Sequence, residues 1–290
     1  MHPRLRILGL FALLGALFAI IGWVLGGYFA GGNFILGAAF FLVLAAAFNL
    51  ISYFYSSKIV LMSYGARILK ENEYPWLHEM VARIAEKAGI PKPKVAIIKT
   101  KTPNAFATGR NPKNAVVAVT EGIMDVLSRT ELEGVLAHEV AHVKDRDILV
   151  MTVAATMAGA IAFMARIFWF NALFGGRGGR GGEGNALVLL IVAITAPIAA
   201  ILVQLAISRS REYKADKVGS LTIGKPLALA SALNKLEKAN KKRPIDRGNP
   251  ASSSLFIVNP FRGSGFAAIF STHPPMKERI KRLEQLAKET

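Results

Sequence analysis

The stretch His138-Glu139-Val140-Ala141-His142 is the most informative part of this 290-residue chain. Its two histidines are four residues apart, so on a helix they project from one face and can bind a single metal ion. With five histidines in the whole chain, such a motif is expected by chance roughly 0.004 times. The pattern therefore predicts a metal site on a helix, with a solvated, charged helix face as the alternative.

The chain contains no cysteine, which excludes a thiolate zinc site and a disulfide framework. A metal ion must therefore be bound by His, Asp or Glu side chains. Glu139 follows the first histidine and can reach a water activated by the ion, since zinc lowers the pKa of such a water to about 7. The residue types therefore fit a hydrolytic zinc site.

The third metal ligand has to come from elsewhere in the chain, because zinc hydrolases usually use three protein ligands. In an extended motif a glycine and a third histidine would stand where Asp145 and Ile148 are found. Glu212 and Asp216 are four residues apart on an expected helix face. Glu212 can complete the metal site and Asp216 can orient a ligand histidine through its second nitrogen. Spacing alone favours a solvated face for these two carboxylates.

A long apolar region opens the chain. Residues 7–57 contain no charged residue, which suffices for two transmembrane helices at about 7–27 and 34–56, separated by a glycine-rich turn. The first of these is longer than the apolar core of a signal peptide, and a second span follows at once, which favours a retained anchor. Residues 1–57 are therefore predicted to be two transmembrane helices.

A second apolar region covers residues 148–207. Its uncharged runs at 148–165 and 186–207 are predicted to be a third and fourth span, or a helical hairpin that enters the bilayer only in part. The flanking segments 58–147 and 208–290 carry 14 and 17 Lys and Arg residues. By the positive-inside rule both should be cytoplasmic, which predicts a multi-pass protein of the cell membrane.

The net charge of +17 suits the anionic face of a lipid bilayer. No nucleic-acid motif accompanies it, so no nucleic-acid partner is expected. The segments outside the membrane predict an α+β, mostly helical fold. A helix is expected at Pro75–Ala88, strands at Val95–Ile98 and Ala115–Val119, a turn-rich connection at Pro103–Gly109, and helices near 226–241 and 276–288. A capping box of Thr130 and Glu133 is expected to open the helix of the two histidines.

Three motifs together resemble the HtpX-type membrane zinc metalloproteases: H-E-V-A-H, R-E-Y-K-A-D at residues 211–216, and His273-Pro274. The resemblance covers nearly the whole chain. It implies a gluzincin-like metalloprotease domain in two parts, 58–147 and 208–290, with about four transmembrane helices. It also implies one Zn²⁺ per chain with Glu212 as third ligand, polypeptide substrates, and quality control of misfolded membrane proteins under stress.

Further site residues have two readings each. His273 matches the family's His-Pro motif and can stabilise the oxyanion, or it can order a surface turn. Asp147 can anchor the metal helix or simply end it. Asn104 and Ala105 can hold an extended substrate at a strand edge, or belong to an ordinary loop. The remaining histidines, His2 and His78, are expected at the surface.

Two alternatives to this function remain open on the sequence. One is an endopeptidase of the CAAX prenyl-protein type, for which four spans are few. The other is a non-catalytic membrane scaffold with a structural zinc, which would require four protein ligands and leave Glu139 without a role.

Overall fold

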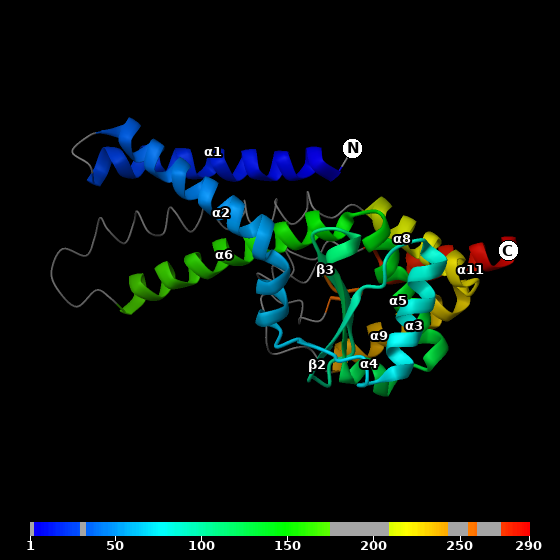
Figure 1. Cartoon of the computed structure of the whole chain (residues 1–290). Coiled ribbons are helices and arrows are strands. Elements are labelled where there is room, and N and C mark those ends of the chain that lie inside the picture. The colour runs from blue at the N-terminus through cyan, green and yellow to red at the C-terminus, as the bar shows by residue number, and fades with distance from the viewer. Residues whose placement is uncertain (1–2, 30–32, 175–208, 243–254, 260–273) are drawn as a thin grey trace.

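The computed structural model describes residues 3–29, 33–174, 209–242, 255–259 and 274–290. A long helical hairpin leads into an α+β domain, as Figure 1 shows. The hairpin consists of α1 (Pro3–Phe29) and α2 (Phe34–Ser63). Gly26 and Gly37 allow the two helices to touch, because a Cβ atom on Gly26 would lie 2.8 Å from the Gly37 Cα.

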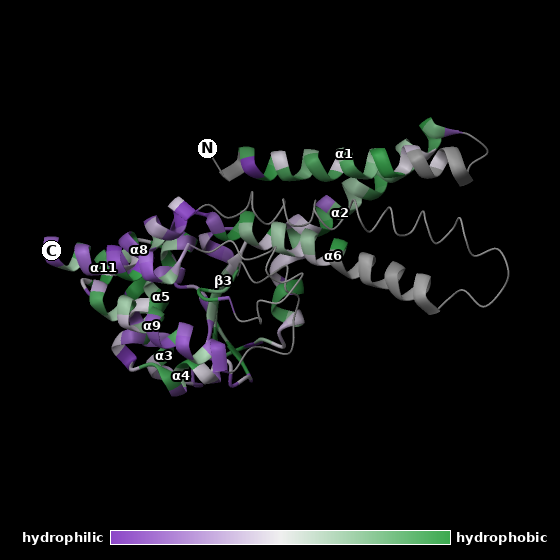
Figure 2. Ribbon diagram, turned by 180° about the vertical axis from the view of Figure 1, so that it is seen from behind, coloured by the Kyte–Doolittle hydropathy of each residue, from purple (hydrophilic) through white to green (hydrophobic). Residues whose placement is uncertain are grey.

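The outer face of α2 is apolar. Exposed fractions reach 81% for Ile35 and 69% for Val43, whereas the core helix of a soluble protein would bury such side chains. Much of α1 is likewise hydrophobic in Figure 2, in contrast to the hydrophilic helices α8 (Arg209–Ile223) and α11 (Met276–Glu289). This surface indicates a membrane protein.

The expectation of about four transmembrane helices is met only in part within the described residues. Within the described residues two helices are long and apolar enough to cross a membrane, at Leu5–Trp23 and Phe34–Ser63. The predicted third span falls on α6 (Asp147–Phe174), whose described apolar part, Asp147–Ile161, is too short to count as a span by itself. It also packs its first turns against the domain. The predicted fourth span, at 186–207, lies outside the described residues.

The domain is built around a four-stranded sheet in the order β1-β2-β4-β3. Strands β2 and β4 are parallel, and the other two pairs are antiparallel. Strand β3 is last in this order and forms one edge of the sheet. The strands are β1 (Arg67–Ile68), β2 (Lys94–Ile98), β3 (Ala105–Gly109) and β4 (Ala115–Thr120). The stretch expected to be a turn-rich connection thus contains β3, whose formation depends on pairing with β4 rather than on its own residues.

Both faces of the sheet are buried. Alternate residues of a strand point to opposite faces, so each face has its own set of contacts. Val95, Ile97 and Val117 pack on one face against α3, α5 and α9. Ala96, Phe106 and Ala118 pack on the other face against the end of α2 and the start of α6. The helices that cover the first face are α3 (Pro75–Ala88), α5 (Arg129–Lys144) and α9 (Pro226–Lys242). The short α4 (Glu121–Val126) contacts α5 and α9, and the 3-10 helix η1 (Pro112–Asn114) directly precedes β4. The end of α2 and the start of α6 are therefore packed directly on the sheet.

The start of α5 differs from expectation. The capping box is formed by Ser128 and Glu131, not by Thr130 and Glu133, because Ser128 has the extended backbone that an N-cap requires. Glu133 instead binds Arg83 and Lys225 at 2.6 and 2.7 Å.

His78, expected at the surface, is 5% exposed, with its Nε2 3.1 Å from the Lys70 carbonyl. A local carbonyl partner makes burial of this polar ring acceptable.

Glu131 predicts a pH dependence of stability. Burial opposes its ionisation, but hydrogen bonds from Lys235, Ser231 and Ser128 outweigh burial and lower its pKa from 4.5 to about 2. A carboxylate with a lowered folded-state pKa stabilises the fold fully above pH 4.5 and loses that effect as the pH falls toward 2. In thermal unfolding, Glu131→Gln should therefore lower Tm more at pH 7 than at pH 3. An equal difference in Tm between the variant and the wild type at both pH values would contradict the lowered pKa of Glu131.

Candidate metal centre

Helices α5 and α8 cross at a glycine, and this contact positions the candidate site. A Cβ atom on Gly219 would lie 2.7 Å from the backbone nitrogen of His138, so no other residue allows the helices to approach so closely. Asp216 and Glu212 precede Gly219 by three and seven residues and lie on the same face of α8. The crossing therefore directs both carboxylates at the histidines of α5.

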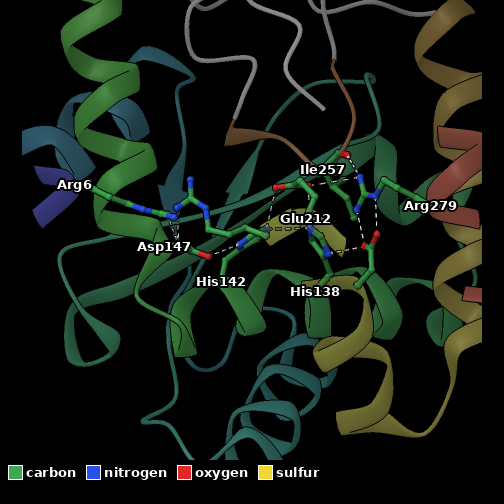
Figure 3. A network of polar contacts seen from close by, with 9 residues as sticks. Arg6, His138, His142, Asp147, Glu212, Ile257 and Arg279 are labelled. Atoms are coloured by element: carbon green, nitrogen blue, oxygen red, sulfur yellow. Dashed lines mark hydrogen bonds and ion pairs between the residues drawn. The ribbon is translucent and has the colours of Figure 1, made fainter. Parts of the chain in front are cut away.

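Three side chains converge there, as the close view in Figure 3 shows for His138, His142 and Glu212. Their exposed fractions are 1%, 3% and 2%. The two Nε2 atoms are 3.2 Å apart, and the Glu212 oxygens lie 3.4 Å from His142 Nε2 and 3.8 Å from His138 Nε2. Ligand atoms around a tetrahedral zinc at 2.0–2.1 Å are separated by about 3.3–3.4 Å. The group fits a metal ion of this size, with all three candidate ligand atoms within 4.8 Å of one another.

Glu139 lies beside this group and is 2% exposed. Burial raises its pKa to about 8, with a further contribution from the negative charge of Glu212. Its carboxylate also has a backbone hydrogen bond with Ala107 of the edge strand β3. A buried carboxyl with a pKa near neutrality can exchange protons at physiological pH, as a general base must.

His138 faces a buried carboxylate with the nitrogen that points away from the group. Its Nδ1 lies 2.9 Å from Asp216 Oδ1. Arg279 of α11, which is fully buried, donates two hydrogen bonds to Asp216 at 2.7 and 2.8 Å and a third to the Ile257 carbonyl at 3.0 Å. Burial opposes ionisation of Asp216, but Arg279 outweighs it and lowers the pKa to about 2. Asp216 is therefore a fixed, ionised partner for His138.

His142 has a similar arrangement on its other side. Its Nδ1 lies 3.7 Å from Asp147 Oδ2, and Arg211 donates to Asp147 Oδ1 at 2.7 Å. Burial favours the neutral ring, but Asp147 and Glu212 outweigh burial and raise the pKa of His142. The carboxylates that favour a proton on this imidazole also favour a bound metal cation. The centre thus has two His–Asp–Arg chains, one for each histidine.

The two arginines in these chains were not singled out in the sequence, although one signal was present. The buried residues of α11 are Arg279, Leu283 and Leu286, so an arginine occupies a position on the apolar face of an amphipathic helix. A charged residue at such a position usually has a buried partner. Arg211 is adjacent to Glu212, but nothing in its spacing distinguishes it from the other basic residues nearby.

Asn104 and Ala105 lie at the start of the edge strand and are almost completely buried. The Asn104 side chain donates to the Val258 carbonyl at 2.6 Å, and the Ala105 carbonyl accepts from Ile257 N–H at 3.2 Å. This end of the β3 edge is thus paired with residues 255–258. Because alternate residues of an edge strand direct their backbone groups outward, the backbone of Ala107 faces the same side as that of Ala105. His273 and His2 lie outside the described residues.

Comparison with known proteins identifies the family of this chain. The profile of peptidase family M48 matches residues 71–287, and the chain belongs to that family. A protease HtpX homolog from Thermococcus sibiricus is 53% identical over 96% of this chain and 94% of its own length. Another from Thermodesulfovibrio yellowstonii is 53% identical over 99% of both chains. The protein is thus an HtpX-type protease, as the resemblance predicted.

Structural similarity to a solved protein is weaker. Ste24p from S. mikatae matches with a TM-score of 0.49 and 16% identity, covering 92% of this chain and 62% of that chain. The coarse prediction of a membrane metalloprotease is supported by the family, the HtpX-type relatives and the apolar helices.

Proposed function

We propose that this chain is a zinc-dependent membrane endopeptidase that hydrolyses peptide bonds of misfolded membrane proteins as part of quality control under stress. The observation that carries the proposal is a buried carboxyl, Glu139, beside three buried side chains spaced to bind one Zn²⁺. The membrane hairpin supports the choice of substrate, because the end of its second helix, α2, packs on the same sheet whose edge lies beside Glu139.

In this proposal His138, His142 and Glu212 bind the ion, and Asp216 and Asp147 orient the two imidazoles. A zinc ion here would polarise the scissile carbonyl and acidify the attacking water. The remaining chemistry belongs to the chain.

Glu139 takes the proton from the water and passes it to the leaving amine. His273 is proposed to donate to the oxyanion.

The substrate is proposed to lie extended along the edge of β3, next to Asn104 and Ala105, whose own end of the edge is already paired with residues 255–258. Backbone pairing with a strand edge tolerates many side chains, which suits an enzyme for damaged proteins. The hydrogen bond between Ala107 and Glu139 supports this position, because it joins the edge to the proposed base. Asn104 would act indirectly, by holding residues 255–258 against the strand.

The active site is proposed to face the cytoplasm from a multi-pass protein of the cell membrane. The support comes from the charge distribution, with 14 and 17 Lys and Arg residues in the segments 58–147 and 208–290. The apolar hairpin would be in contact with the lipid bilayer. No nucleic-acid partner is proposed.

The ligand assignment is tested by Glu212→Ala in the detergent-solubilised chain. A catalytic zinc site has three protein ligands, so loss of one should lower zinc content well below one ion per chain and abolish cleavage of an unstructured protein such as casein. Glu237→Ala, on the partly exposed face of α9, is the matched control and should keep both. Metal analysis after dialysis decides the outcome, since full occupancy in Glu212→Ala would remove Glu212 from the site.

Chelation tests the function as a whole. Removal of metal should abolish casein cleavage and added Zn²⁺ should restore it, whereas cleavage that survives complete metal removal contradicts the proposal. Cleavage of a prenylated peptide in preference to casein would favour an endopeptidase of the prenyl-protein type.

A further inference from the structure

One residue of the membrane hairpin reaches the metal centre. Arg6 of α1 places its Nη1 atom 3.9 Å from Asp147 Oδ1, the same oxygen that accepts a hydrogen bond from Arg211. The other oxygen of Asp147 faces His142. Figure 3 shows Arg6, Asp147 and His142 next to one another in this order. The carboxylate beside a candidate metal ligand is thus contacted by an arginine from the first helix of the chain.

The position of Arg6 is set by the packing of α1 on α6. Three leucines of α1, which follow Arg6 at spacings of four, four and three residues, are buried on the same helix face. They form one cluster with residues of α6 that follow Asp147 at spacings of three, three and four. The two sets are Leu10, Leu14 and Leu17, and Val150, Val153 and Met157.

The Arg6–Asp147 contact is therefore the polar end of an otherwise apolar helix interface. Close packing of that interface leaves little freedom for α1 to slide along α6. A shift of one helical turn would carry Arg6 about 5.4 Å along the helix axis, away from the carboxylate.

The positive charges of the two arginines fix the orientation of the Asp147 carboxylate. Arg6 and Arg211 have side-chain exposed fractions of 23% and 11%, and both guanidinium groups lie against one oxygen of Asp147. Two cations on one oxygen favour the rotamer that directs the second oxygen toward His142 Nδ1. A carboxylate in that orientation keeps the proton on Nδ1 and leaves Nε2 available as a ligand atom.

We propose that Arg6 is a positioning residue of the metal centre, acting through Asp147 on His142. The proposal rests on the zinc site described under the proposed function. It extends the centre to a residue outside the stretch that the profile of peptidase family M48 matches, which begins at residue 71. The first membrane helix would then be part of the enzyme's active structure as well as its anchor.

The test measures zinc affinity of the full-length chain in detergent micelles, by competition with a chelator of known affinity. Loss of a partner behind a ligand histidine typically weakens metal binding 10–100-fold. Since Arg211 remains in place, Arg6→Gln should weaken binding about tenfold. Arg6→Lys should keep most of the wild-type zinc affinity, because lysine retains a positive charge near Asp147. Lys58→Gln removes an exposed charge near the end of α2 and should leave affinity unchanged.

A double-mutant cycle with Asp147→Asn shows whether Arg6 acts through Asp147. In the Asp147→Asn background, Arg6→Gln should cause no further loss of zinc affinity. Wild-type affinity in Arg6→Gln would overturn the proposal, and so would a full tenfold additional loss in the double variant. A lowered Tm of the metal-free protein with unchanged zinc affinity would assign Arg6 to folding alone. If the wild-type chain binds no zinc, the proposed function itself fails, which separates the two results.

Discussion

Glu139→Gln should abolish peptide cleavage while leaving zinc content and fold unchanged. Glutamine keeps the size of the side chain and can still accept the backbone hydrogen bond of Ala107, but it cannot take a proton from water. Loss of a general acid–base group costs about 10²–10⁴-fold in rate. Cleavage of casein by the detergent-solubilised chain, with zinc measured in the same samples, provides the readout.

The matched control is Glu133→Gln, which alters a carboxylate of the same helix whose partners are Arg83 and Lys225. This variant should cleave casein at close to the wild-type rate. Equal rates for Glu139→Gln and wild type would end the catalytic assignment and favour a non-catalytic zinc scaffold.

Arg279→Met is the substitution with the largest expected effect on stability. It leaves Asp216 as a buried carboxylate without its two hydrogen bonds from the guanidinium. Removal of one partner from a buried ion pair destabilises a protein by about 3–5 kcal/mol. For a chain of this size that corresponds to a fall in Tm of roughly 6–20 °C. Zinc affinity should fall as well, because Asp216 would no longer be fixed beside His138.

Arg282→Met, one turn further along α11, is the comparison. Arg282 is half exposed, pairs with Glu278 at 2.8 Å and lies 4.0 Å from the centre of the Tyr213 ring. Exposed pairs of this kind contribute about 1 kcal/mol or less. Thermal unfolding and zinc titration of both variants would show the difference. Similar small losses in the two would mean that Asp216 does not depend on Arg279.

Periodicity was sufficient to predict much of the fold. Helix α3 was predicted at its observed bounds, Pro75–Ala88, and β2 and β4 were predicted within one residue at each end. Amphipathic spacing and short apolar runs are local signals, so a single sequence contains them. The edge strand β3 was missed because the residues Ala105–Gly109 have little strand preference of their own. Their conformation depends on pairing with β4.

For the candidate site too, local signals were predictable from the sequence and long-range contacts were not. The histidines four residues apart, and the carboxylates four residues apart, each share a helix face, and the structure brings Glu212 to the histidines as expected. Local spacing could not reveal that Arg279 binds Asp216, 63 residues away, or that Arg6 reaches Asp147. Such contacts depend on how whole helices pack, and a single sequence does not state that. His273, predicted to assist at the oxyanion, remains a prediction.

The position of Arg279 far behind the metal helix in the sequence has a consequence during synthesis. Domains begin to fold while the ribosome is still adding residues, with the earlier segments first. The helix with both histidines and the membrane hairpin emerge long before α11, the helix that holds Asp216 in place. A half-made copy should therefore bind metal poorly. A newly translated chain would become able to cut other proteins only once α11 has left the ribosome and docked.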